Sequence, residues 1–166
     1  MANQTNKVTL RARDGNIFQI EEDIATEFGT LKALIEEDGF SDSVIPLSNV
    51  WSPTLAKVIE YCRKHYEFRS RPDQNSGNRL NDEKAFDDDF ISDLDEAKLK
   101  EMLLAANYLD VKGLLNLISR TIADRIKNKS VEFIRKFFRV ENDYTPQEER
   151  DVREKYAWTF QGVDDD

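Results

Sequence analysis

The chain has 166 residues, 34% of them charged, and a formal net charge of −9 at pH 7. This length suits one compact domain with appendages, and the acidic balance argues against nucleic acid or an anionic membrane surface as the main partner. The single cysteine, Cys62, excludes an internal disulfide, and the polar opening MANQTNKVTL does not resemble a signal peptide. These features predict a cytoplasmic and nuclear protein without a membrane-spanning segment.

The stretches VTLRA and IFQI flank Asp14-Gly15 and predict a β-hairpin. A two-residue loop would place the apolar residues of the two strands on opposite faces of the hairpin. One more loop residue brings them onto the same face. We therefore expect a three-residue loop with Gly15 in the left-handed region.

A helix, a strand and a second helix are predicted to follow. LKALIEEDG predicts a short helix that Thr30 caps and Gly39 ends, and VIPL predicts a third strand. Ser52-Pro53 then begins a longer helix, with the serine as N-cap and the proline in the first turn. The side chains expected to face the core are Leu31, Leu34 and Ile35 in the first helix and Leu55, Val58, Ile59 and Cys62 in the second.

Residues 69–83, RSRPDQNSGNRLNDE, lack apolar periodicity and predict a flexible surface loop. The acidic segment FDDDFISDLDE begins three residues later. We favour a solvated segment anchored by Phe86 and Phe90 over a calcium site, because an EF-hand loop needs a glycine for its turn.

From Asp95 onward the pattern is helical. One apolar stripe (Leu99, Met102, Leu103 and Ala106) leads into Asn107-Tyr108. A second stripe begins directly after Asp110, which we expect to cap its helix. The second stripe consists of Val111, Leu114, Leu115, Ile118, Ile122 and Ile126.

Two further helices are predicted near the end of the sequence. Ser130 is placed to cap VEFIRKFF. Thr145-Pro146-Gln147-Glu148 matches a capping box with proline at the first helical position. It begins a helix that runs toward Trp158.

The residues give little support to an enzyme. The six glycines form no phosphate-binding pattern, and neither HExxH nor CxxC occurs. Cys62 and His65 are spaced for one helical face, but we favour a packed, inert cysteine beside a surface histidine over a catalytic dyad. A zinc site lacks a second Cys/His pair. We therefore expect no cofactor, no metal and no small-molecule substrate.

Aromatic and basic residues alternate in YCRKHYEFRSR, as in nucleic-acid binders. We interpret this stretch as the basic end of a helix beside an acidic neighbour, because the surrounding charge is negative. The last 40 residues are rich in aromatic side chains, more than two short helices can enclose. This excess favours a partner-binding surface over a purely internal role.

The order of motifs resembles the Skp1 family, the adaptors of cullin-RING ubiquitin ligases. The matching stretches are ARDGNIFQIE, IPLSNV, LAKVIEYCRKH, LLAANYLDVKGLL, IRKFF and NDYTPQEE. The resemblance implies an α/β fold of the BTB/POZ type, a three-stranded sheet with surrounding helices, followed by a C-terminal helical extension. It also implies a non-catalytic adaptor that bridges a cullin scaffold to F-box substrate receptors in an SCF-type ubiquitin ligase.

The resemblance further implies boundaries and contact residues. The expected regions are a BTB/POZ-like core at 6–67, a polar loop at 68–84, completing helices at 85–127, F-box-binding helices at 128–162 and an acidic tail at 163–166. Asn107 and Tyr108 are the expected cullin contacts. The expected F-box contacts are Leu99, Leu103, Ile118, Ile122, Ile126, Ile134, Phe137, Phe138, Val140 and Trp158.

The sequence departs from the family pattern mainly near its end. The usual TPEEIRKTF reads SVEFIRKFF, so Phe133 replaces an acid and Phe137 a threonine, and the usual ENxW reads Lys155-Tyr156-Ala157-Trp158. We expect these aromatics to narrow the set of F-boxes that bind, because a partner must match the added bulk. The alternative is a self-associating BTB/POZ module that does not engage a cullin.

Overall fold

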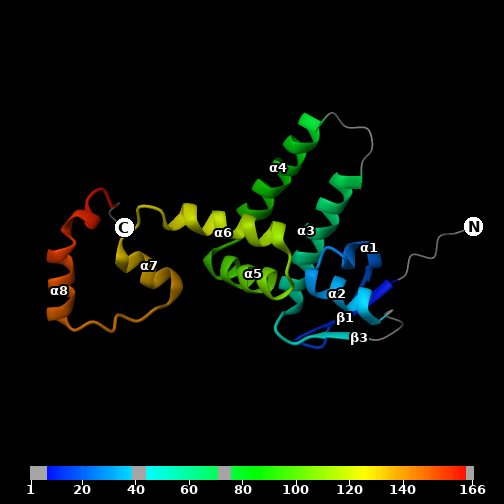
Figure 1. Ribbon diagram of the computed structural model, residues 1–166, viewed down its shortest axis with the longest axis horizontal. Helices are drawn as coiled ribbons and strands as arrows, with labels where there is room; N and C mark the ends of the chain where they lie inside the picture. Colours follow the sequence, from blue (N-terminus) through cyan, green and yellow to red (C-terminus); the bar gives the residue numbers. More distant parts are fainter. Residues whose placement is uncertain (1–6, 39–43, 71–75, 164–166) are drawn as a thin grey trace, which may run out of the picture. The chain divides into compact units, whose positions relative to one another are not determined.

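The computed structural model describes residues 7–38, 44–70 and 76–163 of the chain. These residues form a mixed α/β fold that divides into two compact units, Met1–Ser119 and Arg120–Asp166, with the division inside one helix (Figure 1). This confirms the predicted fold class. Within the described ranges, no helix combines the length and apolar character needed to cross a bilayer.

The first unit contains a three-stranded sheet in the order β2-β1-β3, built from β1 (Lys7–Ala12), β2 (Ile17–Glu21) and β3 (Val44–Leu47). Strand β1 pairs antiparallel with β2, with Leu10 opposite Phe18, and parallel with β3. The backbone N–H of Ala12 donates to Asn16 over 2.9 Å, and this bond closes the hairpin loop between them. Gly15 in that loop has φ +86°. The predicted three-residue loop, left-handed glycine and third strand are confirmed.

Two helices follow β2. Helix α1 (Glu22–Ala25) is a single turn that the sequence did not predict, and α2 (Gly29–Asp38) begins before Thr30. The predicted cap is therefore wrong: the Thr30 hydroxyl donates instead to the backbone carbonyl of Leu109, far along the chain, over 3.1 Å. Leu31 is buried as expected, whereas Leu34 is 37% exposed. Gly39 lies outside the described residues.

Helix α3 (Ser52–Ser70) begins at the predicted Ser52-Pro53, and its predicted apolar stripe is buried. The Ser52 hydroxyl donates to Asp14 in the hairpin loop over 2.5 Å, and it accepts from the Asn16 side chain over 3.0 Å. These bonds connect the hairpin to the first turn of α3.

Helix α4 (Ser76–Ser92) corrects the loop predicted over residues 69–83: residues 69 and 70 belong to α3, and the chain is helical again from Ser76. Residues 71–75 lie outside the described ranges. The loop prediction failed because α4 packs against α3, and local composition does not reveal such a contact. Phe86 and Phe90 of α4 lie 6.3 and 5.5 Å, centroid to centroid, from the Tyr61 ring of α3. Phe90 is buried, so the predicted anchoring role of this pair is confirmed.

Helix α5 (Glu96–Tyr108) is capped by Asp95, whose carboxylate accepts from the Lys98 backbone N–H over 2.8 Å. Leu99, Met102 and Ala106 are buried, in agreement with the predicted stripe. Helix α5 packs against α3, and α6 (Lys112–Ile126) follows after a short break.

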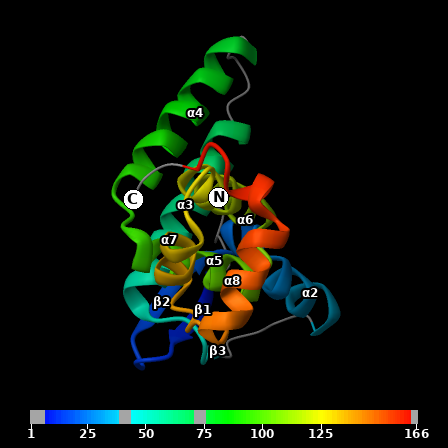
Figure 2. The ribbon, with the colours of Figure 1, turned by 90° about the vertical axis from the view of Figure 1, so that its left-hand side faces the viewer.

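The second unit contains the end of α6, then α7 (Val131–Phe138), α8 (Pro146–Lys155) and the short 3₁₀ helix η1 (Ala157–Phe160), which are coloured from yellow to red in Figure 2. The Ser130 hydroxyl accepts from the Phe133 backbone N–H over 3.0 Å. Thr145 and Glu148 form both halves of the predicted capping box. Both predicted helix starts are confirmed. Sequence alone could identify them because helix caps depend on residues close along the chain.

Candidate binding surfaces

The break between α5 and α6 is a tight helix C-terminus. The Val111 backbone N–H donates to Ala106 over 2.9 Å and the Asp110 backbone N–H donates to Asn107 over 3.2 Å, which is the hydrogen-bond pattern of a Schellman motif. Asp110 takes the left-handed position of this motif, with φ 52°. The prediction that Asp110 caps α6 is wrong, because its backbone ends α5 instead.

This motif places Asn107 and Tyr108 in the last turn of α5, both exposed to solvent. Tyr108 is 36% exposed, so part of this residue is available to a partner. The neighbouring backbone is held by α2, since the Gly29 N–H donates to the Asp110 carbonyl over 3.2 Å and Thr30 bonds to Leu109. The pair is therefore presented on a fixed end of a helix.

Leu104 lies one helical turn before Tyr108 on the same face of α5 and is 70% exposed. The sequence did not lead us to expect Leu104 as a contact residue. A signal was present, however, because Leu104 lies outside the buried stripe of α5 that contains Leu99, Met102 and Ala106. An apolar residue on the solvent side of an amphipathic helix is a candidate contact.

The F-box contacts expected in the first unit are mostly internal. Leu99 and Ile118 each have 0% of their surface exposed, and Leu103 is half-buried. Leu99 and Ile118 thus contribute to the core of this unit and present no surface to a partner in this structure. Their direct contact with an F-box stays a prediction.

In the second unit, the expected F-box contacts divide into buried and exposed sets. Phe137 is 1% exposed and Ile122 6%, while Ile126 and Ile134 are half-buried. Phe138, Val140 and Trp158 are 39, 59 and 72% exposed, respectively. The exposed set supplies the large apolar surface of this unit that a partner can reach.

Phe137 is the centre of an aromatic cluster on α7. Its ring centroid lies 6.2 Å from that of Phe133 and 5.0 Å from that of Phe138, the latter pair edge to face. Such pairs contribute about 0.5–1.5 kcal/mol beyond the burial of their area. Two of the three aromatics that depart from the family pattern, Phe133 and Phe137, therefore pack within this unit. Tyr156, the third, is 42% exposed.

Ion pairs connect α7 to α8. Glu149 of α8 accepts from Arg135 of α7 over 3.3 Å and from Arg153 over 3.2 Å, and Arg153 also pairs with Glu132 of α7. Hydrogen bonds from Arg153, Asn142 and Arg135 lower the pKa of Glu149, and those from Arg153 to Glu149 and Glu132 raise the pKa of Arg153. No residue of α8 is buried, so this network is a main connection between the two helices.

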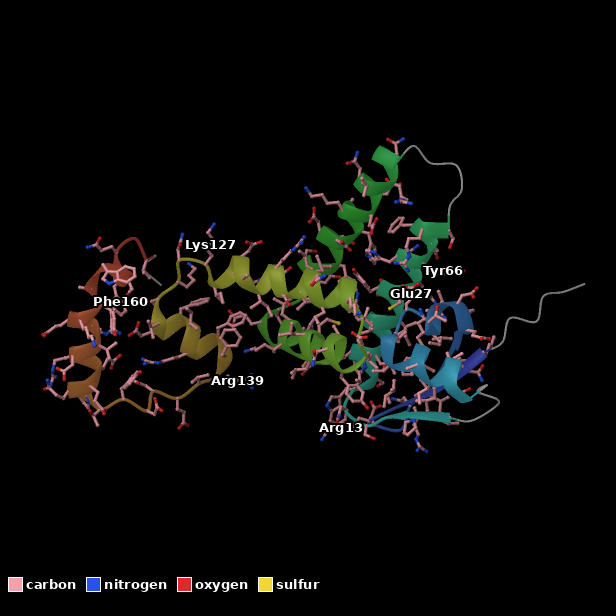
Figure 3. All side chains as sticks on the ribbon, viewed as in Figure 1. Arg13, Glu27, Tyr66, Lys127, Arg139 and Phe160 are labelled. Atoms are coloured by element: carbon pink, nitrogen blue, oxygen red, sulfur yellow. The ribbon has the colours of Figure 1, made fainter. Side chains whose placement is uncertain are left out.

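A small cavity of about 90 Å³ lies beside this network. It is lined by apolar side chains that include Val131, Val152 and Phe160, together with the Tyr144 ring. The Arg153 guanidinium lies 5.1 Å from the Phe160 ring centroid. Figure 3 shows Arg139 at the end of α7 and Phe160 beyond α8, at opposite ends of this helix pair.

The candidate catalytic pair does not have the properties of a reactive dyad. Cys62 is buried, and burial together with the nearby Glu27 carboxylate raises the pKa of its thiol to about 12. The predicted inert, packed cysteine is consistent with this environment.

The prediction that His65 lies on the surface is wrong, since this side chain is 8% exposed and α4 covers it. Its Nδ1 lies 3.0 Å from Glu83 Oε1 and its Nε2 2.8 Å from Asp87 Oδ1.

Among the described residues, no cluster of three or more histidine, cysteine or acidic side chains is arranged to hold a metal ion. Exposed side chains that suit a partner include Asn107, Tyr108 and Leu104 in the first unit and Phe138, Val140, Tyr144, Tyr156 and Trp158 in the second. Amide, phenol and large apolar groups of this kind suit protein recognition.

Two family models match the chain. Residues 6–67 match the model described as "Skp1 family, tetramerisation domain", and residues 112–159 match "Skp1 family, dimerisation domain". SKP1-like protein 1A of Arabidopsis thaliana is 44% identical over 158 residues, which cover 93% of this chain and 98% of the relative.

Two further relatives come from other lineages. The SCF ubiquitin ligase complex protein SKP1a of Dictyostelium discoideum is 44% identical over 153 residues, 91% of this chain and 94% of the relative. SKP1-like protein 20 of Oryza sativa subsp. japonica is 42% identical over 167 residues, 93% of this chain and 94% of the relative. Identity at this level along nearly the whole length, with both family models matched, shows that the chain belongs to the Skp1 family.

Proposed function

We propose that this protein is a non-catalytic adaptor that bridges a cullin to F-box proteins in an SCF-type ubiquitin ligase. The observation that carries the proposal is the Asn107-Tyr108 pair, exposed at a helix end that α2 holds in place. A separate set of exposed aromatic and aliphatic side chains in the second unit supplies the other partner surface. The relative named as an SCF ubiquitin ligase complex protein supports the same role.

On the cullin side, Asn107 and Tyr108 offer directional hydrogen bonds and a rigid ring with little side-chain entropy to lose. Leu104 extends the same face of α5 by one turn. Protein interfaces combine an apolar core with a polar rim, and these three side chains offer both kinds of contact. We assign these three residues to the cullin.

On the F-box side, Phe138, Val140 and Trp158 are the residues most available to a partner. Tyr144 and Tyr156, 49 and 42% exposed, extend this set. Phe137 and Ile122 are buried and act by holding the exposed set in place. The ion pairs between α7 and α8 keep the two helices together before an F-box binds.

The proposed mechanism is that of a scaffold. No bond is made or broken on this chain. By holding a cullin and a substrate receptor at once, the protein raises the effective concentration of the substrate beside a ubiquitin-charged enzyme. This role agrees with a buried, protonated Cys62. The proposed site of action is the cytoplasm and nucleus, as the sequence led us to expect.

Separation-of-function variants test the proposal. Titration calorimetry would measure the binding of a cullin N-terminal domain and of an isolated F-box segment to the same protein. The double variant Asn107→Ala, Tyr108→Ala is expected to weaken cullin binding and to leave F-box binding unchanged. The double variant Val140→Asp, Trp158→Ala is expected to weaken F-box binding and to leave cullin binding unchanged. A protein that binds neither partner and forms stable homodimers would instead support a self-associating module, a property to which the family-model descriptions refer.

A further inference from the structure

The three-stranded sheet of the first unit has one face without a covering helix. Figure 1 shows the helices of this unit on one side of β1 and β3, and no described helix or strand of the same unit lies on the other side. The strands alternate accordingly: Val8, Leu10 and Ile45 are buried, while Arg11, Val44 and Pro46 beside them are exposed. We call the outward surface the sheet-face patch. Its members are Arg11, Arg13, Ile17, Val44, Pro46 and Trp51.

The members of the sheet-face patch are adjacent. Arg11 of β1 is paired with Ile17 of β2 on one side and with Pro46 of β3 on the other. The Arg13 backbone N–H donates to the Val50 carbonyl over 2.9 Å, which brings Trp51 beside the end of β1. The Arg13 guanidinium lies over the Trp51 ring, 4.8 Å from its centroid.

The large apolar members of the patch are about half exposed. Ile17, Val44 and Trp51 are 54, 43 and 48% exposed. Tryptophan and arginine are the residues most enriched in interface hot spots. A half-exposed tryptophan with a guanidinium on its face is therefore a suitable anchor for a partner.

The charge of the patch is opposite to that of the chain. The protein has a formal net charge of −9, yet Arg11 and Arg13 form no ion pair with any described residue. The carboxylates of the hairpin loop and of β2 have other partners: Asp14 accepts from Ser52, and Glu21 pairs with Arg63 over 3.1 Å. Two guanidinium groups thus remain available on an apolar surface.

We propose that the sheet-face patch docks an acidic segment of a partner protein in which carboxylates stand next to aliphatic side chains. Guanidinium forks bind carboxylates with two parallel hydrogen bonds, and Ile17, Val44 and Pro46 give aliphatic side chains a place to pack. The patch is made from elements other than the end of α5 and α7–α8. The inference therefore stands independently of the proposed cullin and F-box contacts.

Two other occupants fit less well. A nucleic acid would offer phosphates to the arginines, but the net charge of −9 repels a polyanion, and the aliphatic members do not suit bases. A second copy docked face to face would bring the same guanidinium groups against one another. Like charges in that position oppose the contact.

The test uses the full chain and a fluorescein-labelled hexapeptide of alternating glutamate and leucine, measured by fluorescence anisotropy. Two control peptides replace glutamate by lysine or leucine by serine. We expect the glutamate–leucine peptide to bind more tightly than either control, and binding to weaken as salt rises. Arg11→Glu with Arg13→Glu, and separately Trp51→Ala, are expected to weaken binding by about tenfold. Lys112→Glu with Lys127→Glu, two exposed charge reversals outside the patch, matches the charge change of the arginine variant and should leave binding unchanged.

Circular dichroism of each variant would establish that the fold is kept, since all substituted side chains are exposed. Equal binding by wild type and by both patch variants would overturn the proposal, as would the absence of wild-type binding at millimolar peptide. Displacement of the peptide by a single-stranded oligonucleotide of equal charge would overturn it in favour of a nucleic-acid site. Sedimentation velocity that shows a dimer lost in Trp51→Ala would overturn it in favour of a second copy.

Discussion

The backbone N–H of Gly29 donates to the carbonyl of Asp110 over 3.2 Å, and a β-carbon at Gly29 would lie 2.1 Å from the Asp110 carboxylate oxygen Oδ2. The start of α2 therefore rests directly on the left-handed residue that ends α5. This contact connects the N-terminal part of the chain to the turn that presents Asn107 and Tyr108. It also explains why the stretch LAANYLDVKGLL interrupts its helical pattern at Asp110.

Gly29→Ala is expected to destabilise the protein by about 1–3 kcal/mol, because the new methyl group overlaps the Asp110 side chain. Chemical denaturation would measure the change. Gly77→Ala in α4 is the matched control, since a β-carbon there meets nothing within 4 Å. The control should stabilise slightly, by about 0.4–1 kcal/mol. Equal effects of the two substitutions would contradict the proposed contact.

Leu104→Ala is expected to weaken binding of a cullin N-terminal domain by about 1 kcal/mol, and Tyr108→Ala by about 2 kcal/mol. Both side chains lie on one exposed face of α5. Isothermal titration calorimetry would give the two affinities. Leu80→Ala on α4 is the control, because Leu80 is also exposed, at 58%, but lies outside this face. An unchanged affinity for Leu104→Ala would remove this residue from the proposed surface.

The network around Glu149 predicts a pH dependence. Because Arg153, Asn142 and Arg135 lower the pKa of Glu149 in the folded state, the stabilisation is present above the unfolded value of 4.5 and is lost as the pH falls through the folded value. Thermal melts of wild type and Glu149→Gln should differ near pH 7 and converge in acid. Glu154→Gln, an exposed acid on the same helix, should follow wild type throughout. A Glu149→Gln difference that persists in acid would argue against an ionic origin.

Cys62 is expected to resist thiol reagents in the folded protein. Burial raises the pKa of its thiol to about 12, so very little thiolate forms at pH 8. Reaction with an aromatic disulfide reagent should be slow until denaturant is added and fast afterwards. Rapid labelling of the native protein would contradict this prediction and support a reactive Cys62.

The altered aromatics now make separate predictions. Phe137 is buried against Phe133 and Phe138, so Phe137→Ala should lower the free energy of unfolding by about 3–5 kcal/mol.

Tyr156 is exposed and can contact a partner, so Tyr156→Asn should widen the set of F-boxes that bind. An F-box panel assayed against both proteins checks the second prediction. If wild type and Tyr156→Asn bound the same F-boxes, Tyr156 would not determine which receptors bind.

The features predicted correctly from sequence depend on neighbours along the chain. The hairpin register, the Ser130 cap and the Thr145–Glu148 capping box each follow from residues a few positions apart. Resemblance to known motifs supplied the fold class and the exposed Asn107-Tyr108 pair, which no periodicity could identify as functional.

The incorrect predictions concern contacts between residues far apart in sequence. Residues 76–83 lack an apolar pattern, yet they are helical at the start of α4, whose later turns pack on Tyr61 and His65. The same packing buries His65. Asp110 is a local exception, because it ends α5 in the left-handed position where it was expected to cap α6. Thr30, in contrast, bonds to Leu109 and does not cap its own helix. Composition and spacing carry no record of such long-range partners.

The most direct test of the adaptor role is size-exclusion chromatography with light scattering on the protein alone, with each partner, and with both. We expect a monomer that forms a 1:1 complex with an F-box segment, a 1:1 complex with a cullin N-terminal domain, and a ternary complex whose mass is the sum of all three. A stable homodimer that ignores both partners would contradict this expectation.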